Sequence, residues 1–228
     1  MGVEKFFVYY NANDKELEET QRYWKTLVEA GIIELVPFYF KTRGYVDGIQ
    51  TPAYSDCFYK HKDQVKWLGI LDTDEFFKLA PSTPFETLPD YLNSLEGYSR
   101  IAFHKAHFVY ENGNVSNYIE KCPYPSFIND WLLMAFEKDQ APKSIYLAEK
   151  VIYPDVHFAK GIVGRTIKIN EKDAFVSHYR YPYIPNTFDG LKNGNYKKNE
   201  YYKNVFGLKV LQKLDEMGFS EYKVDCLS

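Results

Sequence analysis

One short stretch constrains the fold of this 228-residue chain more than any other. Residues 67–77 read Trp-Leu-Gly-Ile-Leu-Asp-Thr-Asp-Glu-Phe-Phe, so an apolar run leads directly into three acids. A continuous apolar run of this length is typical of a strand buried on both faces, as in a parallel sheet. Carboxylates at the end of such a strand lie where open α/β sheets bind their ligands. The stretch therefore predicts an α/β domain with a polar site at this strand end.

The two aspartates of this stretch have the chemistry of a metal site. Asp72 and Asp74 are two residues apart, and in an extended chain such side chains project to the same side. Carboxylate oxygens are the ligands that Mg²⁺ or Mn²⁺ prefers, usually together with substrate phosphates. The alternative is a turn with solvated acids. The acids interrupt an apolar run and do not lie in a polar loop, which favours the metal site.

Turn and periodicity signals divide the chain into elements. In the first half we expect strands at 6–10, 33–40 and 67–71, and helices at 15–30 and 52–64, with Gly31 ending the first helix and Pro52 opening the second. Their alternation predicts parallel neighbouring strands. In the second half we expect a loop or short helix at 82–95, strands at 100–110, 143–152 and 165–169, a short helix at 129–137, and a helix or helix pair at 196–217.

Composition excludes several classes of protein. The net charge is −3 without a long single-sign run, which does not support a nucleic-acid partner. No stretch approaches 18 apolar residues, so we expect no transmembrane segment, and the start is too quickly polar for a signal peptide. Three widely spaced cysteines indicate neither a disulfide framework nor a zinc site, and favour a reducing, cytoplasmic location. Peripheral contact with a membrane remains compatible with this composition.

Three more residues have both a functional and a structural interpretation. His157 follows a predicted strand and could complete a metal site, although a single histidine is more often structural. Arg180 follows His178 and Tyr179 and could pair with phosphate, or form a surface salt bridge. Asp130 stands at a predicted helix start, where an N-cap is the structural alternative to a catalytic acid.

Five motifs in order along residues 2–179 carry a family resemblance. Residues 2–10 resemble the GV..F..Y strand of the family, and its helix before the acidic motif is matched by Gln50, Ala53, Asp56 and Cys57. The W…D.DEF motif itself is matched by Trp67 and residues 72–76. Later in the chain, residues 143–145 with Val156 and His157 resemble a K.I…VH segment, and His178 with Tyr179 resembles an HY pair. The set resembles glycosyltransferase family 92 and the neighbouring family-2-like enzymes of the type A glycosyltransferase fold.

The resemblance implies a fold and an activity. The fold is a Rossmann-like mixed sheet flanked by helices, here a single domain with a nucleotide-sugar half (1–80), an acceptor half (81–180) and a helical extension (181–228). The activity is transfer of a sugar from a nucleotide-sugar donor, often UDP-linked, to a hydroxyl of a glycan or glycolipid. Mn²⁺ or Mg²⁺ is the implied cofactor.

The same resemblance implies roles for individual residues. Asp72, Asp74 and His157 would hold the metal ion through the donor pyrophosphate. Asp130 is the candidate general base for an inverting reaction. The candidate donor-binding residues are Asn11, Gln50, Asp56, Asp72 and Arg180.

The chain also departs from the family pattern. Members usually carry a strand and a helix before the segment that matches residues 2–10. We therefore expect residues 6–10 to form a sheet edge and nucleotide binding to be weak and indifferent to the base. Residues 103–107 lack the usual Phe-Gly pair, so acceptor recognition is expected to differ.

Two functions other than glycosyl transfer are compatible with the sequence. The first is a non-catalytic domain of the same fold that binds a nucleotide or glycan. The second is a haloacid-dehalogenase-type phosphatase, which also places Asp-x-Asp after an apolar strand. Such enzymes usually have Thr or Val where this chain has Phe76, and no later acidic pair lies in a suitable context.

Overall fold

The computed structural model describes residues 2–11, 14–38, 47–110, 131–136, 142–155 and 159–179, together with residues 216 and 218. The chain divides into two compact units. The first unit comprises Met1–Ile70, Lys78–Phe103 and Ala141–Ala174, and the second comprises Leu71–Phe77, His104–Gln140 and Phe175–Ser228. We describe each unit separately.

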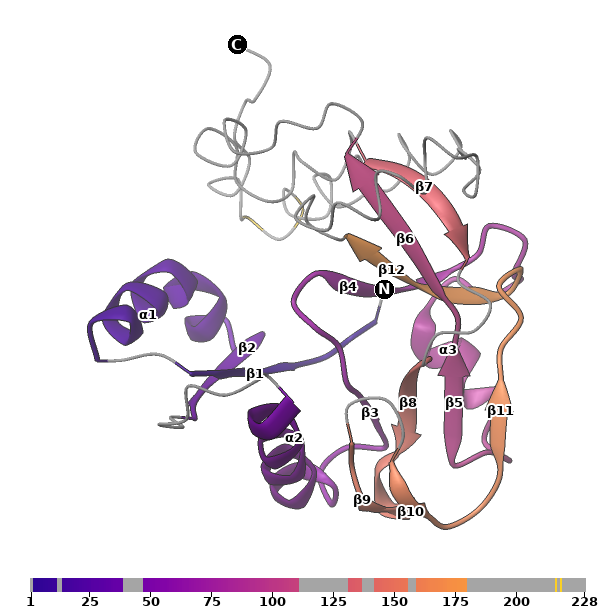
Figure 1. Cartoon of the computed structure of the whole chain (residues 1–228), viewed down its shortest axis with the longest axis horizontal. Helices are drawn as coiled ribbons and strands as arrows, with labels where there is room; N and C mark the ends of the chain where they lie inside the picture. The colour runs from indigo at the N-terminus through magenta and orange to yellow at the C-terminus, as the bar shows by residue number, and fades with distance from the viewer. Residues whose placement is uncertain are drawn as a thin grey trace. The chain divides into compact units, whose positions relative to one another are not determined.

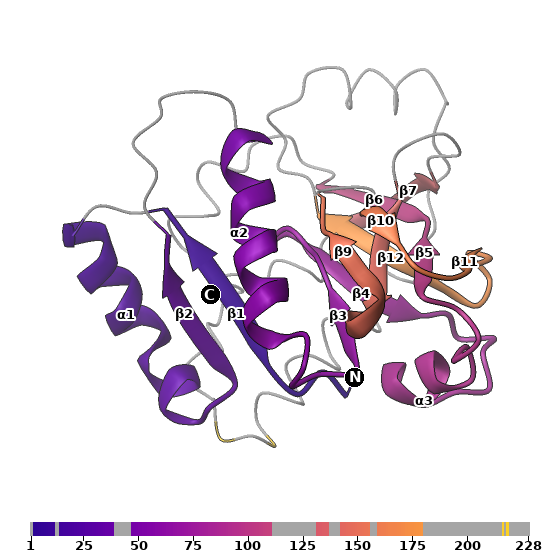
Figure 2. The same ribbon diagram turned by 90° about the horizontal axis from the view of Figure 1, so that it is seen from below.

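The first unit begins with a strand, a helix and a parallel strand, as predicted. These are β1 (Phe6–Tyr10), α1 (Asp14–Glu29) and β2 (Ile33–Pro37), shown in Figures 1 and 2. Helix α1 is followed by Gly31 with a φ of 72°, and the Ile32 N–H donates to the Leu27 carbonyl at 3.0 Å. Glycine reaches this conformation without a Cβ clash, which is why it can end the helix where the sequence indicated.

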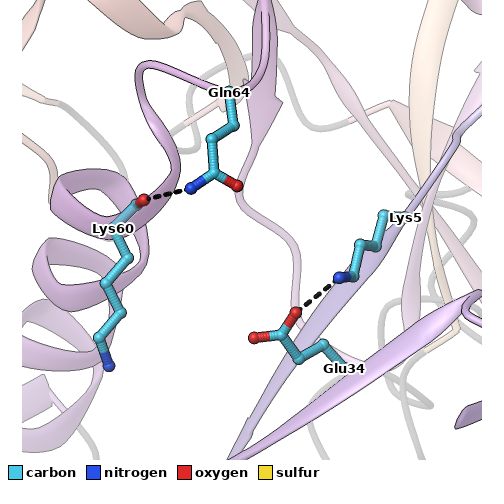
Figure 3. A network of polar contacts seen from close by, with 4 residues as sticks. All are labelled: Lys5, Glu34, Lys60 and Gln64. Carbon is cyan, nitrogen blue, oxygen red and sulfur yellow. Dashed lines mark hydrogen bonds and ion pairs between the residues drawn. The ribbon is translucent and has the colours of Figure 1, made fainter.

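Polar contacts join neighbouring segments of this unit (Figure 3). The Lys5 ammonium lies 2.6 Å from the Glu34 carboxylate of β2, and both side chains are exposed. At the end of helix α2 (Asp47–His61), the Gln64 side-chain amide donates to the Lys60 carbonyl at 3.1 Å. This bond satisfies one of the carbonyls that a helix end leaves without a helical partner.

The predicted start of α2 at Pro52 is wrong, because the helix begins at Asp47 and contains Pro52. The prediction used the preference of proline for the first helical position. Proline has no N–H, so this helix lacks one backbone hydrogen bond in its second turn.

The larger sheet of the first unit has the strand order β11-β5-β8-β3. Strand β8 (Lys143–Leu147) runs antiparallel to both β3 (Trp67–Gly69) and β5 (Arg100–Phe103), and β11 (Thr166–Lys168) runs parallel to β5. The prediction of a strand at 67–71 with parallel neighbours and two buried faces is therefore wrong. In the described residues β3 is a short edge strand with an antiparallel neighbour and an exposed Gly69.

The apolar residues of that stretch are buried by packing against a helix. Leu68 and Ile70 belong to a core cluster with Phe58 of α2 and Tyr146 of β8, and Phe7 of β1 packs against it. The rings of Phe58 and Tyr146 meet edge to face, with centroids 5.8 Å apart. This arrangement suits the aromatic quadrupoles, so the cluster fixes α2 on the sheet.

Smaller elements complete the first unit. Residues predicted as one strand at 143–152 form β8, the 3-10 turn η2 (Ala148–Lys150) and β9 (Val151–Tyr153), which pairs with β10 (Lys160–Ile162). Helix α3 (Leu88–Asn93) lies in the predicted 82–95 segment and is capped by the Thr87 side chain.

A second four-stranded sheet has the order β4-β12-β6-β7, and most of its residues lie in the second unit. Its strands are β4 (Glu75–Leu79), β6 (Lys105–Tyr110), β7 (Trp131–Phe136) and β12 (Ala174–Tyr179). Strand β6 runs parallel to β12 and antiparallel to β7.

Two predictions about this sheet are wrong. Residues 100–110 form not one strand but β5 and β6, which are separated at His104 and belong to different sheets. Residues 131–136 are a strand and not part of a helix. The run Trp-Leu-Leu-Met-Ala-Phe is apolar throughout, and periodicity cannot distinguish a buried strand from a buried helix in such a run.

The architecture is a mixed α/β fold with several small sheets and few helices. A Rossmann-like sheet of the type A glycosyltransferases is not confirmed, since the described strands form two four-stranded and two two-stranded sheets. In the described part of the chain β1 pairs with β2 alone, which agrees with the expected sheet edge. The predicted helix at 196–217 lies almost entirely outside the described residues. None of the described helices is long and apolar enough to cross a membrane.

Replacing Phe58 with alanine should destabilise the first unit. Phe58 is 3% exposed in the core cluster, and a buried Phe→Ala change costs about 3–5 kcal/mol. The neighbouring Tyr59 is 55% exposed, so Tyr59→Ala is a matched control that should cost about 1 kcal/mol or less. Urea unfolding of the three proteins measures the difference, and equal losses in the two variants would contradict this description of the core.

Lys78 makes the stability depend on pH. Burial lowers the pKa of this lysine from 10.5 to about 7 in the folded protein. Between about pH 7 and 10.5 the unfolded chain therefore binds the proton and the folded chain does not. The free energy of unfolding should rise with pH across this window, by at most about 1.4 kcal/mol per pH unit.

The variant Lys78→Met should lose this dependence. Its advantage in unfolding free energy over the parent protein should be largest below pH 7 and should shrink towards pH 10. Chemical denaturation at several pH values measures it, with Lys172→Met as the exposed control. Parallel curves for the parent and Lys78→Met would show that the buried amine does not titrate in this range.

Candidate functional site

The acidic stretch forms a tight turn at the start of β4. The Glu75 N–H donates to the Asp72 carbonyl at 3.0 Å, which closes a four-residue turn. The Glu75 side chain closes the same turn a second time, since its Oε2 accepts the Asp72 N–H at 3.1 Å. Asp72 and Asp74 thus lie in a turn and not in an extended strand, which corrects the geometric argument made from their spacing.

His178, which lies 104 positions after Asp74 in the sequence, contacts this turn. The Nε2 atom of His178 lies 3.3 Å from Asp74 Oδ2, and its Nδ1 atom lies 3.6 Å from Glu75 Oε1. The His178 side chain is 10% exposed, Asp74 is 32% exposed and Glu75 is fully buried. The imidazole is therefore held between one partly exposed and one buried carboxylate.

The pairing of β4 with β12 brings these residues together. Glu75 is the first residue of β4, and His178 stands near the end of β12, the neighbouring strand in the sheet. From Ala174 to His178 every residue of β12 is buried, so the strand is fixed on both faces. His178 is held at one end of this buried strand, next to the turn, and the adjacent strand β6 places His107 in register with it.

The first unit contains three of the predicted donor-binding residues. Asn11 follows β1, Gln50 lies in the first turns of α2, and Asp56 lies in the middle of the same helix. The Tyr9 hydroxyl donates to Asp56 Oδ2 at 2.6 Å, and the Lys60 ammonium lies 2.7 Å from the same oxygen. These contacts give Asp56 a structural role in linking β1 to α2.

Burial and hydrogen bonding act on the Tyr9–Asp56 pair in opposite directions. Burial, together with its hydrogen bond to the carboxylate, raises the pKa of Tyr9 well above its usual value. Burial also tends to raise the pKa of Asp56, but the hydrogen bonds from Lys60 and Tyr9 outweigh it and the pKa is lowered. Asp56 is therefore an anion near neutral pH.

Three predicted site residues lie outside the described residues. These are the candidate base Asp130, the candidate metal ligand His157 and the candidate phosphate partner Arg180. Their roles remain predictions.

The donor set at the turn fits a divalent ion only in part. Within the described ranges no group of three or more His, Cys, Asp or Glu side chains is arranged to hold a metal ion. The 3.3 Å between His178 Nε2 and Asp74 Oδ2 is, however, close to the separation of neighbouring ligands on one ion with bonds of about 2.1 Å. A site with few protein ligands suits an ion such as Mg²⁺, which takes further oxygens from phosphate and water.

Sequence reasoning placed the two aspartates at the site but gave no role to Glu75 or His178. His178 had a usable signal, since it belongs to the HY pair that resembles a family motif and stands two positions after the apolar residues 174–176. Glu75 had none beyond its place in the acidic stretch. Its burial depends on contacts between segments far apart in the sequence, which only the structure shows.

Comparison with protein families agrees with the motifs. The model of Glycosyltransferase family 92 matches residues 1–217, nearly the whole chain and including the turn and both strands of the site. No curated protein matches the chain. The family is defined by glycosyl transfer, which implies a sugar donor and a glycan acceptor. The chain belongs to glycosyltransferase family 92.

Proposed function

We propose that this protein transfers a sugar from a nucleotide-sugar donor, UDP-linked in the first instance, to a hydroxyl of a glycan or glycolipid, with the help of Mn²⁺ or Mg²⁺. One observation carries the proposal. Asp74 and His178, which are 104 positions apart in the sequence, lie 3.3 Å apart beside Asp72. A carboxylate turn with an imidazole alongside is a suitable place for an ion that binds a pyrophosphate.

The proposed metal ligands are Asp72, Asp74 and His178, with His157 as a further candidate. Bound there, the ion would act as a Lewis acid and stabilise the negative charge that develops on the leaving nucleoside diphosphate. The Asp74 side chain is more exposed than that of His178, so a metal–nucleotide complex would reach Asp74 first. His178 is almost buried and is fixed by its strand, so it would limit how far the complex can shift.

Other residues have supporting roles in this proposal. Asn11, Gln50 and Asp56 are the proposed donor contacts of the first unit, and Arg180 is the proposed partner of a phosphate. Because Asp56 already accepts hydrogen bonds from Tyr9 and Lys60, its part in donor binding would be indirect. Asp130 is the proposed general base for an inverting reaction. For the protein as a whole we propose a cytoplasmic location.

A non-catalytic domain that binds a nucleotide or glycan is the second candidate. The observation that favours it is the two-stranded β1-β2 sheet, which leaves one edge of β1 without a paired strand among the described residues. A pocket for the nucleotide base next to such an edge would be less complete. Weak binding indifferent to the base is expected on either interpretation, so only turnover separates them.

Removing the Asp74 carboxylate should abolish metal-dependent nucleotide binding. Calorimetry with UDP should show binding that requires Mn²⁺ in the parent protein, and a loss of about tenfold or more in Asp74→Ala, because a charged metal ligand is removed. Asp63→Ala removes an exposed aspartate outside the turn and should bind as the parent does. UDP binding without metal that is unchanged in Asp74→Ala would contradict the proposal.

Turnover distinguishes the enzyme from the binding domain. We expect slow hydrolysis of a UDP-sugar that requires Mn²⁺ and is lost in Asp74→Ala, since water can replace the acceptor hydroxyl. Chromatographic detection of released UDP measures it. Metal-dependent UDP binding without any release from a panel of UDP-sugars would favour the non-catalytic domain.

A further inference from the structure

We propose that the first unit binds a neutral glycan on an exposed apolar surface, with a sugar ring stacked on Tyr153. We call it the hairpin surface; it consists of Tyr59 of α2, Ile152 and Tyr153 of β9, and Val163, which follows β10. The inference deepens the proposed function and rests on it in one respect, since it takes the bound glycan to be the acceptor. Glycan binding itself can be measured without turnover.

Exposed apolar side chains gather at this place. The described part of the chain exposes seven large hydrophobic side chains, and four of them form the hairpin surface. The exposed fractions are 55% for Tyr59, 46% for Ile152, 62% for Tyr153 and 58% for Val163. Single exposed apolar residues are normal on a protein, but a contiguous group of them indicates a binding surface.

Strand pairing and one hydrogen bond bring these residues together. Strands β9 and β10 are antiparallel (Figure 1), with Val151 opposite Ile162, and both of these side chains pack in the core cluster. The pairing continues to Val163, whose N–H donates at 3.0 Å to the residue before β9. Because side chains alternate along a strand, Ile152 and Val163 point away from the core. The Tyr59 hydroxyl donates to the Ile152 carbonyl at 2.9 Å, which holds its ring beside β9.

Tyr153 is the most exposed of the four and ends β9. At the neighbouring Gly161 a Cβ atom would lie 3.4 Å from Tyr153 Cδ2 and 3.3 Å from Ile152 Cβ, so an edge of the ring lies against the β10 backbone. Gly161 has a φ of 79°, which glycine adopts without steric cost. The ring is thus supported along one edge while much of its surface faces solvent, as a platform for stacking requires.

The size of the hairpin surface argues against a stable interface with a second copy of this chain. At about 200 Å² for a whole large side chain, the exposed fractions of the four residues amount to roughly 400 Å². One partner of a stable protein interface contributes about 800 Å². One or two sugar rings match the smaller area.

The charge around the hairpin surface favours a neutral ligand. The Lys150 ammonium lies 3.0 Å from Glu149, and the Lys60 ammonium lies 2.7 Å from Asp56, so both cations are neutralised locally. The Lys62 ammonium lies 5.8 Å from the centroid of an aromatic ring of this surface. Attraction to an anionic membrane requires a cluster of about four to eight basic residues, which these described side chains do not provide.

The chemistry of a sugar ring matches an exposed tyrosine. One face of a β-linked galactose or glucose ring presents C–H groups that the neighbouring oxygens make electropositive, whereas the face of an aromatic ring is electronegative. Stacking removes both faces from water, and the sugar hydroxyls at the edge stay solvated. The chain belongs to a glycosyltransferase family, so a glycan is a molecule that it has to bind.

Removing the Tyr153 ring should remove glycan binding. The parent protein, applied to an array of neutral β-linked oligosaccharides, should bind at least one of them, and calorimetry with that oligosaccharide then gives the Kd. We expect Tyr153→Ala to lose about tenfold or more in affinity, because the apolar ring face is no longer buried. Tyr153→Phe keeps the ring and should stay within about twofold of the parent. Phe6→Ala changes an exposed aromatic side chain outside the hairpin surface and should bind as the parent does.

Three results would overturn the inference. The first is a parent protein that binds no glycan of the array, or binds one equally well in Tyr153→Ala. The second is flotation with phosphatidylglycerol-containing vesicles that is lost in Tyr153→Ala, since the surface would then bind a membrane. The third is a dimer in analytical ultracentrifugation that dissociates in this variant, since the surface would then bind a second copy.

Two combinations of results separate this inference from the proposed function. Asp74→Ala should bind the glycan as the parent does, because Asp74 is not part of the hairpin surface. Glycan binding that requires Tyr153, in a protein that releases no UDP from any UDP-sugar, would support the hairpin surface and contradict the proposed transfer. Release of UDP together with glycan binding that does not depend on Tyr153 would do the reverse.

Discussion

The arrangement of the site depends on one fully buried carboxylate. Glu75 stands at the first position of β4, where its two oxygens face the backbone of Asp72 and the ring of His178. The turn at Asp72 and the end of β12 must therefore both be in place for Glu75 to have these two contacts. Folding and site geometry are therefore coupled here. A rearrangement of either segment would remove one of the contacts of this buried side chain.

The first seventy residues were predictable where local chemistry decides the structure. The strand at Phe6–Tyr10, the helix that follows it and the end of that helix at Gly31 depend on periodicity and a left-handed glycine, which are properties of neighbouring residues. The errors in the strands occur where pairing between distant segments decides the structure, whereas the wrong helix start at Pro52 came from a local signal. Strand β7 pairs antiparallel with β6, and β3 pairs antiparallel with β8. No local pattern specifies which strand will be the partner.

The candidate site divides in the same way. The acidic motif drew attention to Asp72 and Asp74 because consecutive acids after an apolar run are unusual, and the structure places both in one turn. The extended conformation predicted for these two residues is wrong, because a spacing of two residues occurs in a turn as well as in an extended chain. His178 lies far from the turn in the sequence, and it contacts Asp74 only because β12 lies beside β4. A family motif pointed to that residue, but its geometry depends on a sheet that the local sequence does not specify.

The informative stretch of the sequence is the whole four-residue turn from Asp72 to Glu75, and not the two aspartates alone. The spacing of Asp72 and Asp74 identifies two candidate metal ligands, but it does not show which contacts hold their side chains in place. The fourth residue of the turn closes it from both the backbone and the side chain, and its second oxygen reaches the histidine. The acid that closes the turn is thus also the one whose side chain solvent does not reach.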